Sequence, residues 1–400
     1  IKFLSKTQFT KTFILNNLLF YIKITQMSID ERHLNYVNFN QDRSQICMTT
    51  RDRYCRISVD PFNIIYEKQT INGDDASIFE VLFKSNLAAV VLAGSSASTS
   101  QRLLRIINLR KNQEIASMMY PTMILRVHIN RSVLVVVLET IIYVYDIKTI
   151  NLLHQIVDIP TNPQGISTLA SCHVIGNPEG IGTNSYLAYP SSNTIGEVYI
   201  YDTVGLRFIT AIEAHRSPLS CISFNCTGKL LATASQKGTV IRVFNCSTGQ
   251  KLYEFRRGTM TNATINSMTF NLDSVFLSTT SDKSTIHIFK LQKEEKQEEV
   301  SKSLTSYIIS SASSLITNYF PALVTEPFTQ LRSFAYVVSP SEGNAIVGTL
   351  TGPENNCVLY LVTSNGYFVK YSVDLEKGGE CQEKGRHYIF SNCSNIKKEI

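Results

Sequence analysis

Two adjacent arginines, Arg256 and Arg257, stand within the segment Tyr253-Glu254-Phe255-Arg256-Arg257-Gly258. A guanidinium group binds phosphate through paired N–H donors held in a fixed fork, so an arginine pair is a candidate anion-binding element. In an extended backbone, neighbouring side chains point to opposite sides. We therefore expect Arg256 and Arg257 to face different flanks and to serve two anion pockets.

The sequence on either side of this dipeptide carries two copies of one polar pattern. It reads Ser235-Gln-Lys237-Gly238-Thr239 upstream and Ser281-Asp-Lys283-Ser284-Thr285 downstream. Hydroxyl groups and glycine amides can complete the shell of donors around phosphate oxygens. An isolated Arg-Arg pair is more simply explained as two exposed arginines beside turn residues. The duplicated hydroxyl and lysine residues favour the anion-site interpretation here.

Composition indicates a globular chain with a substantial core. Of 400 residues, 44% are hydrophobic and 18% are charged, and length alone does not decide between one large domain and two or three small ones. The net charge of +6 suits a weak preference for anionic surfaces and falls short of a dedicated nucleic-acid binder.

The nine cysteines are an odd number, scattered and without a C-x-x-C pair. This pattern argues against a disulfide framework or a zinc site, and it favours a reducing compartment. We therefore expect no metal and no cofactor. The cysteines are Cys47, Cys55, Cys172, Cys221, Cys226, Cys246, Cys357, Cys381 and Cys393.

Residues 1–26 differ in character from the rest of the chain. The first methionine is Met27, and the apolar run Phe13–Ile24 contains Asn16, Asn17 and Lys23. A signal peptide is one interpretation, but no small-residue cleavage site follows, and the run is too short to span a bilayer. We favour a disordered extension or a translation artefact for this segment.

A repeated phrase, an apolar–polar–apolar strand ending in asparagine, determines the expected fold. Its copies are separated by one or two units of about 45 residues, the scale of a propeller blade. They are Val37-Asn-Phe39-Asn40, Val127-His-Ile129-Asn130, Ile222-Ser-Phe224-Asn225 and Met268-Thr-Phe270-Asn271.

A second phrase, a β-branched or aromatic strand ending in a polar residue, supplies seven strands of one kind. They begin at Arg56, Arg105, Tyr143, Tyr199, Arg242, His287 and Phe368. A single blade cannot bury both of its faces, whereas a ring of blades can. A β-sandwich is the alternative for short strands, but the regular period fits it poorly. The sequence therefore predicts one all-β, WD40-like seven-bladed propeller over residues 27–395. The expected blades are 30–75, 76–120, 121–158, 159–213, 214–256, 257–330 and 331–395.

The sixth and seventh of these strands lie too far apart, which indicates an insertion at 292–330 in blade 6. It opens with a charge run, Lys293–Glu299, and continues with apolar residues at three- and four-residue steps until Pro321. An amphipathic helix of this kind can lie in a membrane interface or pack against the side of the propeller, and the pattern alone fits both. The candidate membrane-inserting residues are Leu304, Tyr307, Ile308, Leu315, Ile316, Tyr319 and Phe320.

The Phe-Arg-Arg-Gly segment between the fifth and sixth blades resembles the signature of the PROPPIN family. These β-propellers bind polyphosphoinositides and include the WIPI proteins of animals and their yeast autophagy relatives. The resemblance extends from about Leu34 to Cys381 and is densest from Ala214 to Phe289, above all in Leu231–Phe244. Phenylalanine, where the three/four branch has leucine, precedes the two arginines, and in this the sequence resembles the WIPI-one and WIPI-two branch.

The resemblance implies a non-enzymatic protein with two headgroup sites. It leaves open whether phosphatidylinositol 3-phosphate or phosphatidylinositol 3,5-bisphosphate is preferred. Taken alone, His287 and Thr233 would be explained equally well as structural strand residues. The first implied site comprises His215, Thr233, Ser235, Lys237, Gly238, Thr239, Arg242 and Arg256. The second comprises Arg257, Gly258, Ser281, Lys283, Thr285 and His287.

The resemblance also implies where the molecule acts. We expect the edge of blades 5 and 6 to lie against the bilayer, with the 292–330 loop among the lipids. Arg131 and Lys148, near the groove between blades 2 and 3, are expected to take an acidic helical segment of the autophagy conjugation or lipid-transfer machinery. The expected protein is a cytoplasmic monomer that attaches peripherally to preautophagosomal and endosomal membranes.

Three other functional classes fit the sequence less well. An enzyme would need carboxylates and histidines converging on the channel, and the sequence has no evident nucleophile–base pair, metal-spaced set or nucleotide loop. RNA binding is disfavoured by the mild charge and the absence of a basic–aromatic strand pattern. A WD40-like scaffold that binds only proteins is the strongest alternative, although it does not explain the duplicated pattern around two arginines.

Overall fold

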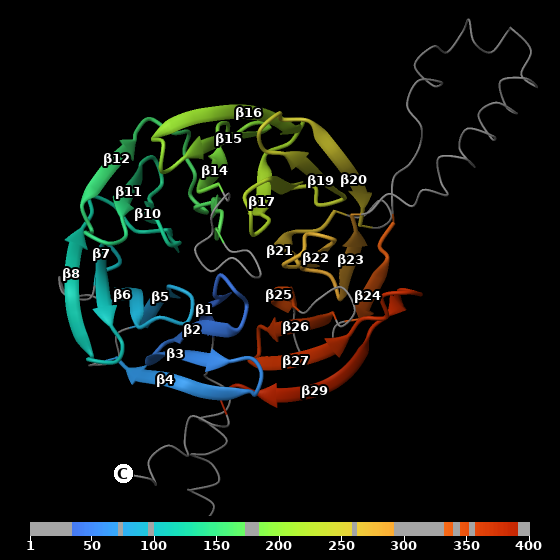
Figure 1. Ribbon diagram of the computed structural model, residues 1–400, viewed down its shortest axis with the longest axis horizontal. Coiled ribbons are helices and arrows are strands. Elements are labelled where there is room, and N and C mark those ends of the chain that lie inside the picture. Colours follow the sequence, from blue (N-terminus) through green and yellow to red (C-terminus); the bar gives the residue numbers. More distant parts are fainter. Residues whose placement is uncertain are drawn as a thin grey trace, which may run out of the picture.

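The computed structural model describes residues 34–70, 75–94, 100–172, 184–257, 262–291, 332–338, 345–351 and 357–390. These residues form strands and no helix, and the strands make seven sheets arranged in a ring (Figure 1). The predicted seven-bladed, all-β propeller is confirmed. The extension at 1–26 and the insertion at 292–330 lie outside the described residues.

The first four blades each use four consecutive strands. Blade 1 comprises β1 (Leu34–Phe39), β2 (Gln45–Thr50), β3 (Arg53–Ser58) and β4 (Asn63–Gln69). Blade 2 comprises β5 (Asp75–Val81), β6 (Leu87–Ala93), β7 (Leu103–Asn108) and β8 (Gln113–Met119). Blade 3 comprises β9 (Arg126–Ile129), β10 (Val133–Val137), β11 (Ile142–Asp146) and β12 (Leu152–Ile156). Blade 4 comprises β13 (Thr168–Leu169), β14 (Tyr186–Pro190), β15 (Gly196–Asp202) and β16 (Arg207–His215).

The last three blades continue the ring. Blade 5 comprises β17 (Leu219–Phe224), β18 (Leu230–Ser235), β19 (Val240–Asn245) and β20 (Lys251–Arg256). Blade 6 comprises β21 (Ile265–Phe270), β22 (Phe276–Ser281), β23 (Thr285–Lys290) and β24 (Ala335–Val338), and β28 (Gly379–Glu380) pairs in parallel with β24. Blade 7 comprises β25 (Ala345–Thr351), β26 (Val358–Thr363), β27 (Tyr367–Ser372) and β29 (Gln382–Tyr388).

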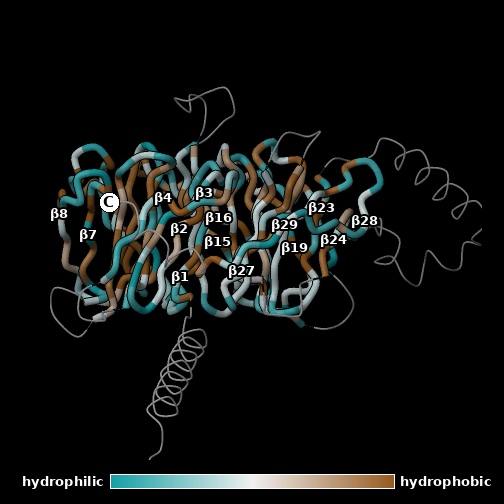
Figure 2. The backbone as a smooth tube through the Cα atoms, turned by 90° about the horizontal axis from the view of Figure 1, so that it is seen from below, coloured by the Kyte–Doolittle hydropathy of each residue, from teal (hydrophilic) through white to brown (hydrophobic). Residues whose placement is uncertain are grey.

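Seven hydrophobic clusters hold the ring together, and each contains residues from two adjacent blades. Burial on both faces explains why a second strand such as β10, Val-Leu-Val-Val-Val, is apolar throughout. The ring closes where Val37 and Phe39 of β1 pack with Tyr360 and Phe368 of blade 7. Closure therefore depends on side-chain packing between complete blades. Seen from the edge, apolar strands fill the disc between two faces of mostly hydrophilic turns (Figure 2).

The asparagine that ends the repeated inner strand is a turn cap that also links neighbouring blades. The Asn40 side-chain oxygen accepts a hydrogen bond from the Gln45 amide (3.0 Å), and its Nδ2 donates to the Phe83 carbonyl of blade 2 (3.2 Å). Asn130 likewise accepts from the Val133 amide (2.9 Å) and donates to the Ala170 carbonyl of blade 4 (2.9 Å). The repeat is therefore structural.

The polar residue that ends the third strand caps the following turn. The Asp146 carboxylate accepts hydrogen bonds from the amides of Lys148 (2.9 Å) and Thr149 (2.8 Å), and Asp202 and Asn245 make equivalent turns. The seven strands of the second phrase are all third strands of their blades.

One predicted blade boundary is wrong. We expected blade 7 to begin at residue 331, but β24 is the fourth strand of blade 6 and pairs antiparallel with β23, with Ile286 opposite Val337. Blade 6 thus takes strands from both sides of the insertion, which connects its third and fourth strands. A four-residue strand after a long interruption carries too little periodicity to be assigned from sequence.

The central channel contains a buried carboxyl group that links blades 1 and 2. Glu80 is 3% exposed and accepts hydrogen bonds from the Tyr36 hydroxyl and from Asn38 Nδ2 (2.7 Å). Burial raises the pKa of Glu80 to about 7, although these two donors and the charge of Arg126 act in the opposite direction. The folded protein therefore holds a proton that the unfolded chain releases at lower pH.

This raised pKa makes the free energy of unfolding depend on pH. As the pH rises from about 4.5 through 7, the unfolded state ionises first, so the free energy of unfolding should fall by on the order of a few kcal/mol. Glu80→Gln keeps an oxygen acceptor and cannot ionise. The melting temperature of the variant should therefore rise relative to that of the wild type between pH 5 and pH 8. The same difference in melting temperature between variant and wild type at pH 5 and at pH 8 would contradict the raised pKa of Glu80.

Candidate functional site

The outermost strand of blade 5, β20, determines where the two arginines point. Phe255 is fully buried, and its ring stacks on Phe289 of blade 6 with centroids 4.7 Å apart. Glu254 faces the other way and contacts Arg242. By the same alternation Arg256 lies on the Glu254 side, and Arg257 lies on the Phe255 side, towards blade 6. The two arginines therefore face opposite sides of β20.

The first candidate site lies between blades 4 and 5 and contains His215, Thr233, Arg242 and Arg256. His215 ends β16, and its Nε2 lies 2.9 Å from the Thr233 hydroxyl of β18. Thr233 stands opposite Arg242 in the β18–β19 ladder. Burial, together with the charge of Arg242, lowers the pKa of His215 to about 4, so the imidazole is neutral at pH 7.

Arg242 is already engaged by protein groups in this site. Its Nε donates to the Glu254 carboxylate (2.8 Å) and its Nη1 donates to the Ala214 carbonyl (2.7 Å). Lys251 also contacts Glu254 (3.0 Å). Burial by itself would raise the pKa of Glu254, but the hydrogen bonds and charges of Arg242 and Lys251 lower it to about 2. A bound anion would have to share Arg242 with this carboxylate.

Arg256 differs from Arg242 in being available to a ligand. It is exposed at the end of β20, and its guanidinium group makes no hydrogen bond or ion pair with any residue that the structure describes. It therefore supplies an accessible positive charge to the first site.

The turn after β18 brings the first polar pattern against blade 6. Ser235 is 7% exposed, Lys237 is exposed and Thr239 is half-buried. Gly238 has a φ of +60°, and a Cβ atom there would lie 1.7 Å from the Ala263 carbonyl oxygen. Only glycine permits this close approach. The turn is held further by the Ala263 amide, which donates to the Lys237 carbonyl (3.1 Å).

Arg257 connects the two polar turns. It is 7% exposed, its Nε donates to the Gly238 carbonyl (3.1 Å), and its Nη1 donates to the Ser281 hydroxyl (3.4 Å). Burial lowers the pKa of Arg257, while the charge of Asp282 opposes that shift. Gly258, the next predicted residue, lies outside the described residues.

The second candidate site lies between blades 5 and 6 and contains Arg257, Thr279, Ser281, Thr285 and His287. His287 stands opposite Thr279 in the β22–β23 ladder. His287 Nδ1 and the Thr279 hydroxyl oxygen are both buried without a hydrogen-bond partner. Burial and the charge of Arg257 lower the pKa of His287 to about 4. Unpaired buried polar atoms are costly, so this site has hydrogen-bonding capacity that a ligand could use.

Sequence reasoning missed Thr279. Its counterpart in blade 5 is Thr233, which does appear among the predicted residues, and the pairings Thr233–Arg242 and Thr279–His287 show the equivalence. By the same pairings, His287 takes the place of Arg242. The polar patterns hide the equivalence of His287 and Arg242, because the turn at Gly238 contains one residue more than the turn after Ser281.

The remaining residues of the second polar pattern lie in the turn between β22 and β23 or at its end, and they differ in exposure. Lys283 is exposed, and its ammonium group lies 3.7 Å from the Asp282 carboxylate. Asp282 in turn accepts a hydrogen bond from the Thr264 amide (3.0 Å), which fixes the turn. Thr285 is half-buried at the start of β23.

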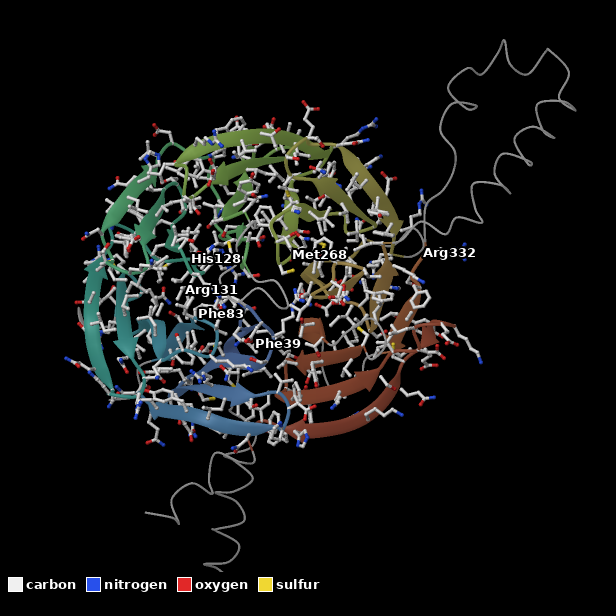
Figure 3. The ribbon with its side chains drawn as sticks, viewed as in Figure 1. Phe39, Phe83, His128, Arg131, Met268 and Arg332 are labelled. Atoms are coloured by element: carbon white, nitrogen blue, oxygen red, sulfur yellow. The ribbon has the colours of Figure 1, made fainter. Side chains whose placement is uncertain are left out.

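The two predicted partner-binding residues occupy different turns of blade 3. Arg131 follows β9, and its guanidinium lies over the Phe83 ring of blade 2, 4.4 Å from the centroid; Figure 3 shows the two side chains together near the centre of the ring. Lys148 is exposed in the outer turn after β11. Both lie on blade 3, across the ring from blades 5 and 6 (Figure 1).

The predicted membrane-inserting residues, Leu304, Tyr307, Ile308, Leu315, Ile316, Tyr319 and Phe320, lie outside the described residues. Nothing in the described part of the chain is a helix with the length and apolar character needed to cross a bilayer.

The central channel contains a cavity with a volume of about 350 Å³. Glu80, Arg126 and His128 line it together with hydroxyl groups from later blades. The His128 imidazole contacts the Ser167 hydroxyl (2.9 Å), and burial with the charge of Arg126 lowers its pKa to about 3. In the described ranges, no three His, Cys, Asp or Glu side chains gather as metal ligands.

Similar proteins agree with this architecture. WD repeat domain phosphoinositide-interacting protein 2 of Gallus gallus is 39% identical over 363 residues, which span 89% of this chain and 79% of that protein. Autophagy-related protein 18 of Yarrowia lipolytica is 35% identical over 401 residues, spanning 90% and 97%. The names of both relatives describe phosphoinositide-interacting or autophagy-related proteins.

Solved structures share the fold. Kluyvelomyces marxianus Hsv2 aligns with a TM-score of 0.66 at 19% identity, over 90% of this chain and 99% of its own. The complex of KlAtg21 with the coiled coil of AgAtg16 aligns with a TM-score of 0.68 at 25% identity, over 89% and 99%. The profile of the PROPPIN family matches residues 33–390, and the resemblance stated from the sequence is confirmed. The chain belongs to the PROPPIN family.

Proposed function

We propose that this chain binds phosphatidylinositol 3-phosphate and phosphatidylinositol 3,5-bisphosphate on membranes and recruits autophagy proteins there. The observation that carries the proposal is the pair of arginines at the end of β20. Arg256 and Arg257 face opposite sides, and each adjoins a cluster of histidine and hydroxyl groups. The relatives' names, which refer to phosphoinositides and autophagy, support the same conclusion.

The two candidate sites would bind the headgroup phosphate by different means. In the first, Arg256 would contribute the free charge, and Arg242 would be shared with Glu254. In the second, phosphate oxygens would accept hydrogen bonds from Arg257 and from the Thr279 hydroxyl, which has no protein partner. Hydrogen bonds between ionised groups are shorter and stronger than neutral ones.

Avidity would convert two weak sites into stable membrane attachment. After one headgroup is bound, the second contact is effectively intramolecular. Each basic residue close to an anionic leaflet adds about 1 kcal/mol. In this proposal the edge of blades 5 and 6 lies against the bilayer, and the 292–330 segment adds apolar contacts with its leucine, isoleucine and aromatic residues. The protein would be a peripheral, non-enzymatic effector on preautophagosomal and endosomal membranes.

The groove between blades 2 and 3 would then be accessible to partners while the opposite edge is on the membrane. A solved neighbour is a complex with an AgAtg16 coiled coil, which supports a helical partner for this chain as well. Lys148 is exposed, and Arg131 has its charge beside Phe83. Both would attract an acidic helix.

Replacing both arginines tests the lipid-binding proposal. Arg256→Thr with Arg257→Thr removes one guanidinium from each site, so affinity for vesicles containing phosphatidylinositol 3-phosphate should fall at least about thirtyfold. Vesicle flotation with defined lipids measures this. A charge-matched control is Arg102→Thr with Arg110→Thr, two exposed arginines of blade 2, which should float like the wild type.

Circular dichroism must show the same fold and a melting temperature near that of the wild type for the Arg256/Arg257 variant. Flotation of that folded variant at wild-type levels would show that the lipid sites lie elsewhere.

Charge reversal tests the partner surface. Arg131→Glu with Lys148→Glu should lower the affinity for an acidic Atg16-type coiled coil at least about tenfold in titration calorimetry, because two attractions become repulsions. Lys229→Glu, an exposed lysine in blade 5, is the control. Equal binding by both variants would exclude this surface.

A further inference from the structure

The two candidate sites occupy equivalent positions on adjacent blades, but the fourth strands of these blades differ. In blade 5, Arg242 stands opposite Glu254 and Val240 stands opposite Arg256. In blade 6, the fourth strand is β24, and the short strand β28 pairs outside it. Strand β24 places Tyr336 opposite His287 and Val338 opposite Thr285. An aromatic and an aliphatic residue therefore take the places of a carboxylate and a guanidinium.

The alternation of β24 turns both of these side chains out of the core. Ala335 and Val337 are 0% and 1% exposed and belong to the cluster between blades 6 and 7. Tyr336 and Val338 are 37% and 54% exposed and face the opposite side. Tyr336 stands between His287 of β23 and Glu380 of β28, and the His287 ring stacks on Phe289 with centroids 6.1 Å apart. Figure 1 shows β24 on the outer side of β23.

Exposed apolar residues occur elsewhere on the rim, so exposure alone does not define a function. What distinguishes this pair is its surroundings. His287 Nδ1 and the Thr279 hydroxyl, which are buried and unpartnered, lie in the adjoining part of the same sheet. Lys283 is exposed two residues before Thr285, and Arg257 lies in the same groove. Apolar groups next to cations and free hydrogen-bonding groups match the layered chemistry of an anionic lipid surface.

We propose that Tyr336 and Val338 form a lipid-contacting apolar surface beside the second site. When that site holds a phosphoinositide headgroup, the two side chains enter the glycerol and upper acyl-chain region of the same bilayer. Tyrosine suits this depth because its ring is apolar and its hydroxyl remains hydrated. This inference rests on the proposed lipid-binding function.

The first site has no such apolar surface, because Glu254 and Arg256 occupy the corresponding positions of β20. Carboxylate and guanidinium groups are expensive to bury in hydrocarbon, so they favour the headgroup layer. The second site should therefore lie deeper in the membrane than the first. The disc would meet the bilayer at an angle, with blade 6 lower than blade 4.

The proposal separates binding of a lipid in a membrane from binding of its soluble headgroup. Tyr336→Ser with Val338→Ser should weaken binding to phosphatidylcholine/phosphatidylserine vesicles containing phosphatidylinositol 3-phosphate about tenfold, from the apolar area withdrawn. Affinity for soluble inositol 1,3-bisphosphate in calorimetry should stay within about twofold, because the cations are intact. The matched control is Tyr199→Ser with Val157→Ser, whose residues are 36% and 53% exposed on blade 4 and after β12 of blade 3. It should bind vesicles like the wild type.

A fluorescent probe tests the same contact without removing a large side chain. Val338→Cys in a Cys393→Ser background can be labelled with a polarity-sensitive dye, because the cysteines of the described residues are buried or half-buried. We expect a blue shift on inositide vesicles and none on vesicles without inositide. The same dye at Val157→Cys should not respond.

Several outcomes would overturn the inference. Unchanged vesicle affinity for the Tyr336/Val338 variant, or no dye response at position 338, would show that this strand does not touch lipid. Equal losses for vesicles and soluble headgroup would place the pair in the headgroup site instead. A dye shift produced by a partner protein and not by vesicles would indicate a protein-docking strand. If the wild type itself ignores inositide vesicles, the proposed function fails first, and the inference fails with it.

Discussion

The anchoring of Phe255 between two blades is the constraint on which the candidate sites depend. This side chain is fully buried and stacks on Phe289, so β20 cannot rotate about its axis. With that residue fixed, backbone alternation directs Arg256 to one groove and Arg257 to the other. A one-residue slip of β20 would exchange every side chain between the two faces and would bury a charge in the aromatic core. Packing in the core thus determines where the surface charges lie.

The two grooves differ in how their polar groups are satisfied. In the first, Arg242, Glu254 and Lys251 compensate one another before any ligand arrives, and Arg256 is the accessible charge. In the second, His287 and Thr279 retain unpaired atoms, and Arg257 is held by the Gly238 carbonyl and Ser281. Binding in the first groove would reorganise existing ion pairs, whereas binding in the second would satisfy groups that are buried without partners. These are different energetic routes to the same ligand chemistry.

Sequence reasoning reached the fold because the repeat has a local cause. The asparagine and aspartate residues that end the strands cap turns within their own blades, so their spacing records the blade period directly. The ion pair between Arg242 and Glu254 was not predicted, because it depends on the register between two strands. Thr279 could have been predicted, because it stands two residues before Ser281 as Thr233 stands two residues before Ser235. The short strand β24 was misplaced because its partner lies on the far side of the insertion.

The most direct test of two separate sites is the stoichiometry of soluble inositol 1,3-bisphosphate, measured by titration calorimetry. The account predicts two headgroups per wild-type chain, and one each for Arg256→Thr and Arg257→Thr taken singly. It is contradicted if the wild type binds a single headgroup, or if either single substitution abolishes all binding in a protein that remains folded.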